Sequence, residues 1–128
     1  MSTKSLGMQD GAQNQLRTES SSLVVTLPQP EKIVERLREI PGLSAETQKG
    51  TDLINYFAYN QGTHITPITL MWTWRLALYD SFSEDPAAYG SMNKNFGEVL
   101  RALIPADRAD FISEAMKLND QHRLIRYK

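Results

Sequence analysis

Residues 66–82 read TPITLMWTWRLALYDSF and contain both tryptophans of the chain, Trp72 and Trp74. Large apolar side chains follow one another here with few interruptions: Ile68, Leu70, Met71, Leu76, Leu78 and Phe82. A segment that is apolar in nearly every direction belongs in the interior of a domain. We therefore expect the core to lie here and the rest of the chain to cover this segment on most sides.

The periodicity of this segment fits two secondary structures. Every even-numbered position from Ile68 to Leu78 is apolar, which is the alternation of a strand. On a helix, its polar residues fall within about 60° of one another and form one narrow stripe: Thr66, Thr69, Thr73 and Asp80. Thr66 followed by Pro67 is a favoured helix start, and the run is longer than most strands. These features favour a helix.

Four other segments carry helix signals, so the sequence predicts an all-α fold, a compact bundle of about five helices. Pro30 suits the first position of one helix, and Ser44 or its rival Thr51 suits the cap of the next. Ser91 precedes the clearest amphipathic pattern in the chain, and Pro105 interrupts that pattern. The expected helices span residues 30–40, 44–60, 66–82, 91–104 and 105–119.

The composition divides the chain into a polar N-terminal arm, a helical domain and a short basic C-terminal tail, at residues 1–29, 30–120 and 121–128. Residues 1–22 hold too few apolar groups to offset their ordering entropy and are expected to be disordered in isolation. The run from Leu23 to Leu27 is β-prone and ends at Pro28. It suits an edge strand, an arm packed on the core, or a segment that pairs with a neighbouring chain.

The composition also excludes several classes of site. The chain has 128 residues, of which 14 are basic, 15 are acidic and none is cysteine. Disulfide frameworks, thiolate zinc sites and iron–sulfur clusters are therefore excluded. Because Arg75 and Asp80 interrupt the longest apolar run, no membrane association is expected. With an N-terminus that lacks the apolar region of a signal peptide, the sequence predicts a cytoplasmic protein, in the host cytoplasm if viral.

The residues that carry chemistry form no catalytic pattern, so we expect no enzyme, no cofactor and no small-molecule substrate. The two histidines, His64 and His122, lie in no metal-binding or catalytic spacing, and no glycine-rich phosphate loop occurs. Asp107, Asp110 and Glu114 share a helix face at i, i+3 and i+7, where three carboxylates could hold a divalent cation. Stabilisation of a helix N-terminus and an i,i+3 ion pair explain them more simply, and we predict no metal site.

We predict a non-enzymatic protein–protein interaction or assembly module that self-associates. The apolar run within the polar arm would dock on a neighbouring subunit, and an aromatic helix face within residues 53–59 would complete the interface. The partner would be a second copy, giving a homo-oligomer, or another protein. The predicted interface residues are Leu23, Val24, Val25, Leu27, Tyr56 and Tyr59.

The basic C-terminal segment supports an alternative function, that of a small nucleic-acid-binding protein of viral or phage type. Its cations would neutralise phosphates, and its tyrosine would stack on a base. The near-neutral charge of the whole chain argues against this alternative. The residues it would use are Lys117, Arg123, Arg126, Tyr127 and Lys128.

Arg75 is the one basic residue within the apolar segment 66–82. A guanidinium there could clamp a carboxylate or phosphate. It could also pair with an internal acid such as Asp80, or extend its stem to solvent. The rarity of unpaired buried charge favours a structural role.

Overall fold

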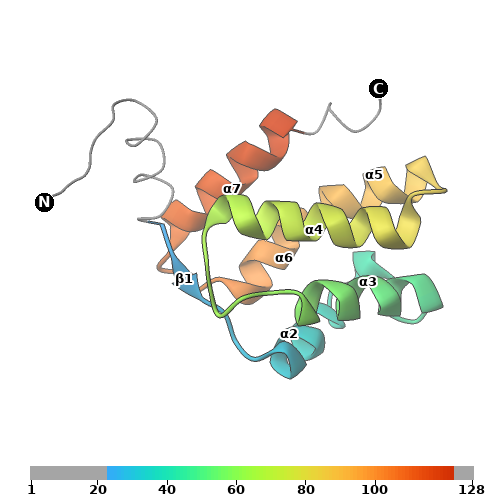
Figure 1. Cartoon of the computed structure of the whole chain (residues 1–128), viewed down its shortest axis with the longest axis horizontal. Coiled ribbons are helices and arrows are strands. Elements are labelled where there is room, and N and C mark those ends of the chain that lie inside the picture. Colours follow the sequence, from blue (N-terminus) through green and yellow to red (C-terminus); the bar gives the residue numbers. More distant parts are fainter. Residues whose placement is uncertain (1–22, 123–128) are drawn as a thin grey trace, which may run out of the picture.

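The computed structural model describes residues 23–122, which fold into a helical domain (Figure 1). The six α-helices of this part are α2 (Pro30–Leu37), α3 (Gln48–Tyr59), α4 (Pro67–Phe82), α5 (Pro86–Lys94), α6 (Phe96–Leu103) and α7 (Ala109–His122). Two short strands, β1 (Val25–Thr26) and β2 (His64–Ile65), and a 3₁₀ turn, η1 (Pro41–Leu43), complete the described elements. The prediction of a compact all-α fold is confirmed, with six helices here instead of about five. None of the described helices is long and apolar enough to cross a membrane.

The central segment is a helix, so the strand alternative for residues 66–82 is wrong. The hydroxyl of Thr66 accepts a hydrogen bond from the Thr69 amide at 3.4 Å, and Pro67 occupies the first turn. Both are the start signals that the sequence displays. Figure 1 shows α4 crossing the middle of the molecule, and it packs against α3, α5 and α7.

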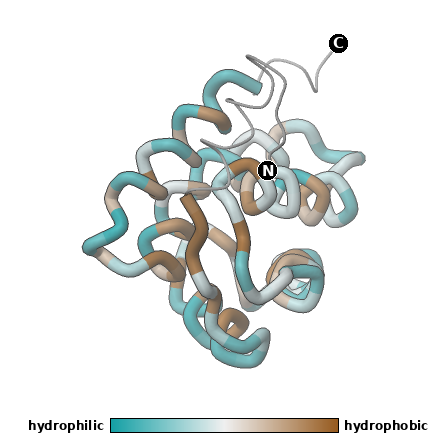
Figure 2. The backbone as a smooth tube through the Cα atoms, turned by 60° about the vertical axis from the view of Figure 1, so that its left-hand side comes forward, coloured by the Kyte–Doolittle hydropathy of each residue, from teal (hydrophilic) through white to brown (hydrophobic). Residues whose placement is uncertain are grey.

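Trp74 of α4 lies at the centre of the core and has no exposed surface. Its ring centroid is 5.3 Å from that of Phe57 on α3, in an edge-to-face arrangement, and 6.3 Å from that of Phe96 on α6, in a stacked one. In Figure 2 the hydrophobic stretches lie mainly inside, where the segments face one another, and the hydrophilic stretches lie mainly around the outside. α4 therefore joins the helices on its two sides into one core.

The run from Leu23 to Leu27 packs on its own chain. β1 pairs antiparallel with β2, with Val25 opposite Ile65, and the Leu27 amide donates to the Thr63 carbonyl at 2.8 Å. Val25 and Leu27 are buried in the core. Residues 1–22, predicted to be disordered, lie outside the described part of the chain. The same holds for most of the predicted basic tail, residues 123–128.

The predicted single helix at residues 91–104 is wrong, because two helices, α5 and α6, meet there at Asn95. Asn95 donates a side-chain hydrogen bond to the Gly42 carbonyl at 3.1 Å, a contact 53 residues distant in the chain. The helix also begins earlier than predicted. The Asp85 side chain accepts from the Ala88 amide at 3.2 Å, so Asp85 is the cap, and Ser91 lies within α5.

Three other helices differ from the prediction in where they begin or end. α2 ends at Leu37 because a separate turn, η1, follows. α3 begins at Gln48, where Thr47 is the cap and its hydroxyl accepts from the Gly50 amide at 3.0 Å. Ser44, the expected cap, has a left-handed backbone with φ of 52°. α7 begins at Ala109 instead of residue 105, and it extends to His122.

We predict that Gly50→Ala destabilises the protein by about 2 kcal/mol or more. Alanine ordinarily favours a helix over glycine, but a Cβ at Gly50 would collide with the backbone carbonyl of Ser44. Gly62→Ala is the matched control, since a Cβ at Gly62 meets no atom within 4 Å. Urea denaturation of both variants measures the difference. Equal stability of the two variants would contradict the prediction.

Candidate functional site

The outer side of α4 carries three large apolar side chains that the described residues leave exposed. Trp72, Leu76 and Tyr79 have 42%, 56% and 65% of their surface accessible. They are spaced by four and three residues, so they lie on one side of the helix. We call these three residues the α4 stripe. It contrasts with the opposite side of α4, which is buried in the core.

The end of α7 forms one border of the α4 stripe. The ring centroids of Trp72 and His122 are 5.4 Å apart, with the rings tilted by 59°. The other border is polar. The Thr73 hydroxyl donates to the Thr69 carbonyl at 2.9 Å, and Asp80 is exposed farther along the helix. An apolar centre with a polar border is the usual composition of a protein–protein contact surface.

Arg75 fixes the end of α7 beside the α4 stripe. Only 5% of its surface is accessible. Its guanidinium donates to the Asn119 carbonyl at 2.7 Å, to the Asn119 Oδ1 at 3.0 and 3.2 Å, and to the His122 carbonyl at 2.8 Å. Carbonyls at a helix C-terminus lack partners within the helix and carry partial negative charge. Arg75 therefore caps α7 from within α4, a structural role of a kind that the sequence does not reveal.

The predicted interface residues divide between the core and the surface. Val25 and Leu27 are buried, and Leu23 and Tyr56 are partly buried against the core. Val24 and Tyr59 are exposed, with 37% and 55% of their surface accessible. Leu23, Val24, Val25 and Leu27 adjoin one another in the chain, whereas Tyr56 and Tyr59 lie on α3. Whether they form an interface stays a prediction.

The residues of the nucleic-acid alternative fall mostly outside the described part of the chain. Lys117 lies within it, on α7, and forms an exposed ion pair with Glu114 at 3.3 Å. Arg123, Arg126, Tyr127 and Lys128 lie outside residues 23–122. This alternative stays a prediction.

Two of the three carboxylates weighed as a cation site make other contacts, and the third, Asp107, lies before the first residue of α7. Asp110 accepts from the Arg108 Nε at 3.1 Å and from the Phe111 amide at 2.8 Å, and Glu114 pairs with Lys117. The hydrogen bond from Arg108, followed by that from Phe111, lowers the pKa of the Asp110 carboxyl below its ordinary value. Within residues 23–122, no three metal-binding side chains lie close enough together to hold an ion.

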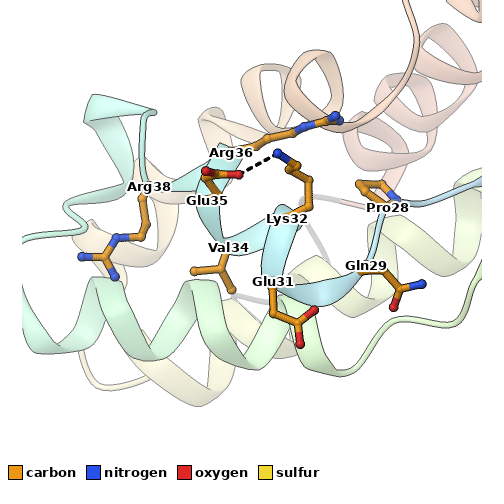
Figure 3. Close-up of a pocket in the computed structure, with 8 residues that line it drawn as sticks. All are labelled: Pro28, Gln29, Glu31, Lys32, Val34, Glu35, Arg36 and Arg38. Atoms are coloured by element: carbon orange, nitrogen blue, oxygen red, sulfur yellow. Dashed lines mark ion pairs between the residues drawn. The ribbon is translucent and has the colours of Figure 1, made fainter.

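The surface around α2 forms an open depression of about 830 Å³ (Figure 3). Figure 3 shows that its side chains extend outward in different directions. Lys32 and Glu35 form an ion pair at 2.9 Å, and the hydrogen bond from Lys32 lowers the pKa of the Glu35 carboxyl. Apart from this exposed ion pair, the charged groups do not converge on one point, so the depression provides no catalytic arrangement. It is lined by Pro28, Gln29, Glu31, Lys32, Val34, Glu35, Arg36 and Arg38.

A smaller hollow of about 200 Å³ lies between α5, α6 and α7. Its lining includes one ammonium, from Lys94, one carboxylate, from Asp120, and the buried amide of Asn93. Pockets for small-molecule ligands usually enclose about 300–1,000 Å³. The hollow is therefore small for a substrate site, and the α4 stripe is the stronger candidate.

Comparison with known proteins identifies no relative. No family model matches the chain, and no curated protein or solved structure matches it either. The assignment of function therefore depends on the residues and geometry described above.

We predict that Arg75→Met lowers the free energy of unfolding by about 2 kcal/mol, because it leaves partly buried acceptors of α7 without their donor. Arg101→Met on α6 is the control, since Arg101 is exposed. Urea denaturation monitored by circular dichroism measures both. If the Arg75 and Arg101 variants lose equal stability, capping of α7 by Arg75 contributes little to the free energy of unfolding, and the prediction is wrong.

We also predict a pH-dependent contribution from Asp110. Its folded pKa lies below its unfolded value, so its stabilisation is present above that unfolded value, near 3.8, and is lost as pH falls through the folded pKa. Asp110→Asn should therefore reduce stability at pH 7 and make progressively less difference toward pH 3. Arg108→Gln also removes the hydrogen bond to the Val24 carbonyl, so it should cost more stability at pH 7, and only the part that depends on Asp110 should fade toward pH 3. Urea denaturation across this pH range tests this, and a constant difference would contradict it.

Proposed function

We propose that this chain is a non-enzymatic protein–protein interaction module whose docking surface is the α4 stripe. The observation that carries the proposal is the exposure of Trp72, Leu76 and Tyr79 together on one side of the central helix. A contiguous patch of exposed apolar side chains with a polar border often marks a protein–protein interaction site. Tryptophan and tyrosine are also the residues that contribute most often to binding energy at interfaces.

Local rigidity supports the same function. Arg75 joins α4 to the end of α7, and Trp74, directly before it in the chain, fills the core. The helix that carries the α4 stripe is therefore held in place by the core and by α7. A rigid surface loses little conformational entropy when a partner binds, which favours affinity.

Self-association through the N-terminal run is a second route within this proposal. Val25 and Leu27 already fill a site on the same chain, and exchange of that segment between two copies would form the same contact across subunits. Tyr59, which is exposed at the C-terminal end of α3, would then be free to contact the second copy.

We infer that the module works in the cytoplasm, in the host cytoplasm if the chain is viral. The absence of cysteine supports this location, since proteins of oxidising compartments frequently rely on disulfides.

Photo-crosslinking tests the docking surface. We predict that benzoylphenylalanine in place of Leu76 gives a discrete covalent adduct on irradiation, in cells that express the chain at its natural level. The same group in place of exposed Glu98 on α6 is the control and should give no such adduct. The double substitution Trp72→Ser and Tyr79→Ser should abolish the adduct at position 76 while changing the free energy of unfolding by about 1 kcal/mol or less, because both side chains are exposed.

Two results would contradict the proposal. One is the absence of any discrete adduct at position 76. The other is the same adduct from positions 76 and 98, which would indicate collision without a defined surface.

A further inference from the structure

The hollow between α5, α6 and α7 is lined by a buried polar group that lacks a partner. Asn93, in the last turn of α5, lines the hollow and has only 7% of its surface accessible. Its Oδ1 accepts no hydrogen bond from the part of the chain that the structure describes. An unpaired buried acceptor destabilises a fold, and its presence is explained when a ligand supplies the missing donor.

Charged groups of both signs surround this amide. Lys94 and Asp120 line the hollow, one from the end of α5 and the other from α7. Arg101 of α6 extends its guanidinium over Gly97, another lining residue, and its Nη2 is 3.4 Å from where a Cβ of residue 97 would stand. Among residues 23–122, none of these three charged groups belongs to an ion pair. Two cations and one carboxylate are therefore available to a ligand.

The wall that α7 contributes is held from the core. Asn119 lines the hollow, and its Oδ1 accepts two hydrogen bonds from the buried Arg75, at 3.0 and 3.2 Å. A wall that is already fixed loses little conformational entropy when a ligand binds, which favours affinity. The volume of about 200 Å³ is below that of pockets for drug-sized ligands, so the occupant is a small molecule.

We propose that this hollow binds a free acidic amino acid, aspartate or glutamate. The two carboxylates of the ligand meet Lys94 and Arg101, and its ammonium group meets Asp120, so each charge faces one of opposite sign. The Asn93 Oδ1 is a further acceptor for the ammonium group. Neutral amino acids and simple dicarboxylates each lack one of these charges. The site is distinct from the α4 stripe, and binding there does not require the proposed interaction module.

Thermal denaturation of the full chain tests the site. We predict that sodium glutamate or sodium aspartate at about 10 mM raises the melting temperature by about 4 °C or more, relative to sodium chloride at the same ionic strength. Glutamine lacks the second carboxylate and glutarate lacks the ammonium group, so each should give a much smaller rise. Circular dichroism at pH 7 measures the melting temperatures.

Asn93→Leu separates ligand binding from folding. Leucine is similar in size to asparagine and has no unpaired acceptor, so this variant should melt no lower than the parent chain and yet lose the response to glutamate. Asp120→Asn repeats the test at an exposed position and should weaken binding several-fold. Lys117→Gln is the matched control, because Lys117 is an exposed charge on α7 that does not line the hollow, and it should respond like the parent chain.

Nuclear magnetic resonance of the isotope-labelled chain locates the ligand. The backbone amide of Gly97 should shift as glutamate is added, whereas that of Gly62, which stands in open space, should not. Three outcomes overturn the proposal. One is a melting temperature no higher than in sodium chloride, and another is an equal rise from glutamate, glutamine and glutarate. The third is an unchanged response in both Asn93→Leu and Asp120→Asn, which would indicate a general effect of the solute.

Discussion

Trp74 has no exposed surface, and its indole packs against Phe57 of α3 and Phe96 of α6. This contact is the constraint on which the remaining packing depends, because two helices from distant parts of the chain meet on one side chain of α4. Burying so large a ring supplies much apolar contact area and fixes the rotation of α4 about its own axis. Once that rotation is fixed, the position of every other α4 side chain follows at about 100° per residue.

The rotation has a consequence on the outer side of the helix. α4 is apolar in nearly every direction, but α3, α5 and α7 cover only part of its circumference. Trp72 and Leu76 are left at the surface, while Arg75 is turned into the domain, where a charge would be costly without partners. The carbonyls of Asn119 and His122 satisfy its guanidinium. The same rotation thus both exposes the α4 stripe and secures α7 beside it.

Local signals in the sequence predict much of this fold and little of its surface. Thr66 and Pro67 identify the start of α4 because capping depends on adjacent residues alone. Asn95 ends a helix through a contact with Gly42, and such a distant partner leaves no periodic signal. The α4 stripe is equally hidden: in a helix that is apolar all round, spacing cannot distinguish Leu76, which is exposed, from Leu78, which is buried. That distinction arises only from tertiary packing.

Exchange of β1 and docking on the α4 stripe differ in what they require of the folded domain. Exchange of β1 between copies must first separate Val25 from Ile65 and expose the buried side chain of Leu27. Such local opening costs free energy and slows assembly. The α4 stripe is already exposed on a helix held by the core, so a partner can dock with little rearrangement, and association is limited mainly by diffusion and orientation. Fast, reversible association is therefore the behaviour expected of the α4 stripe, whereas slow assembly that persists on dilution is expected of strand exchange.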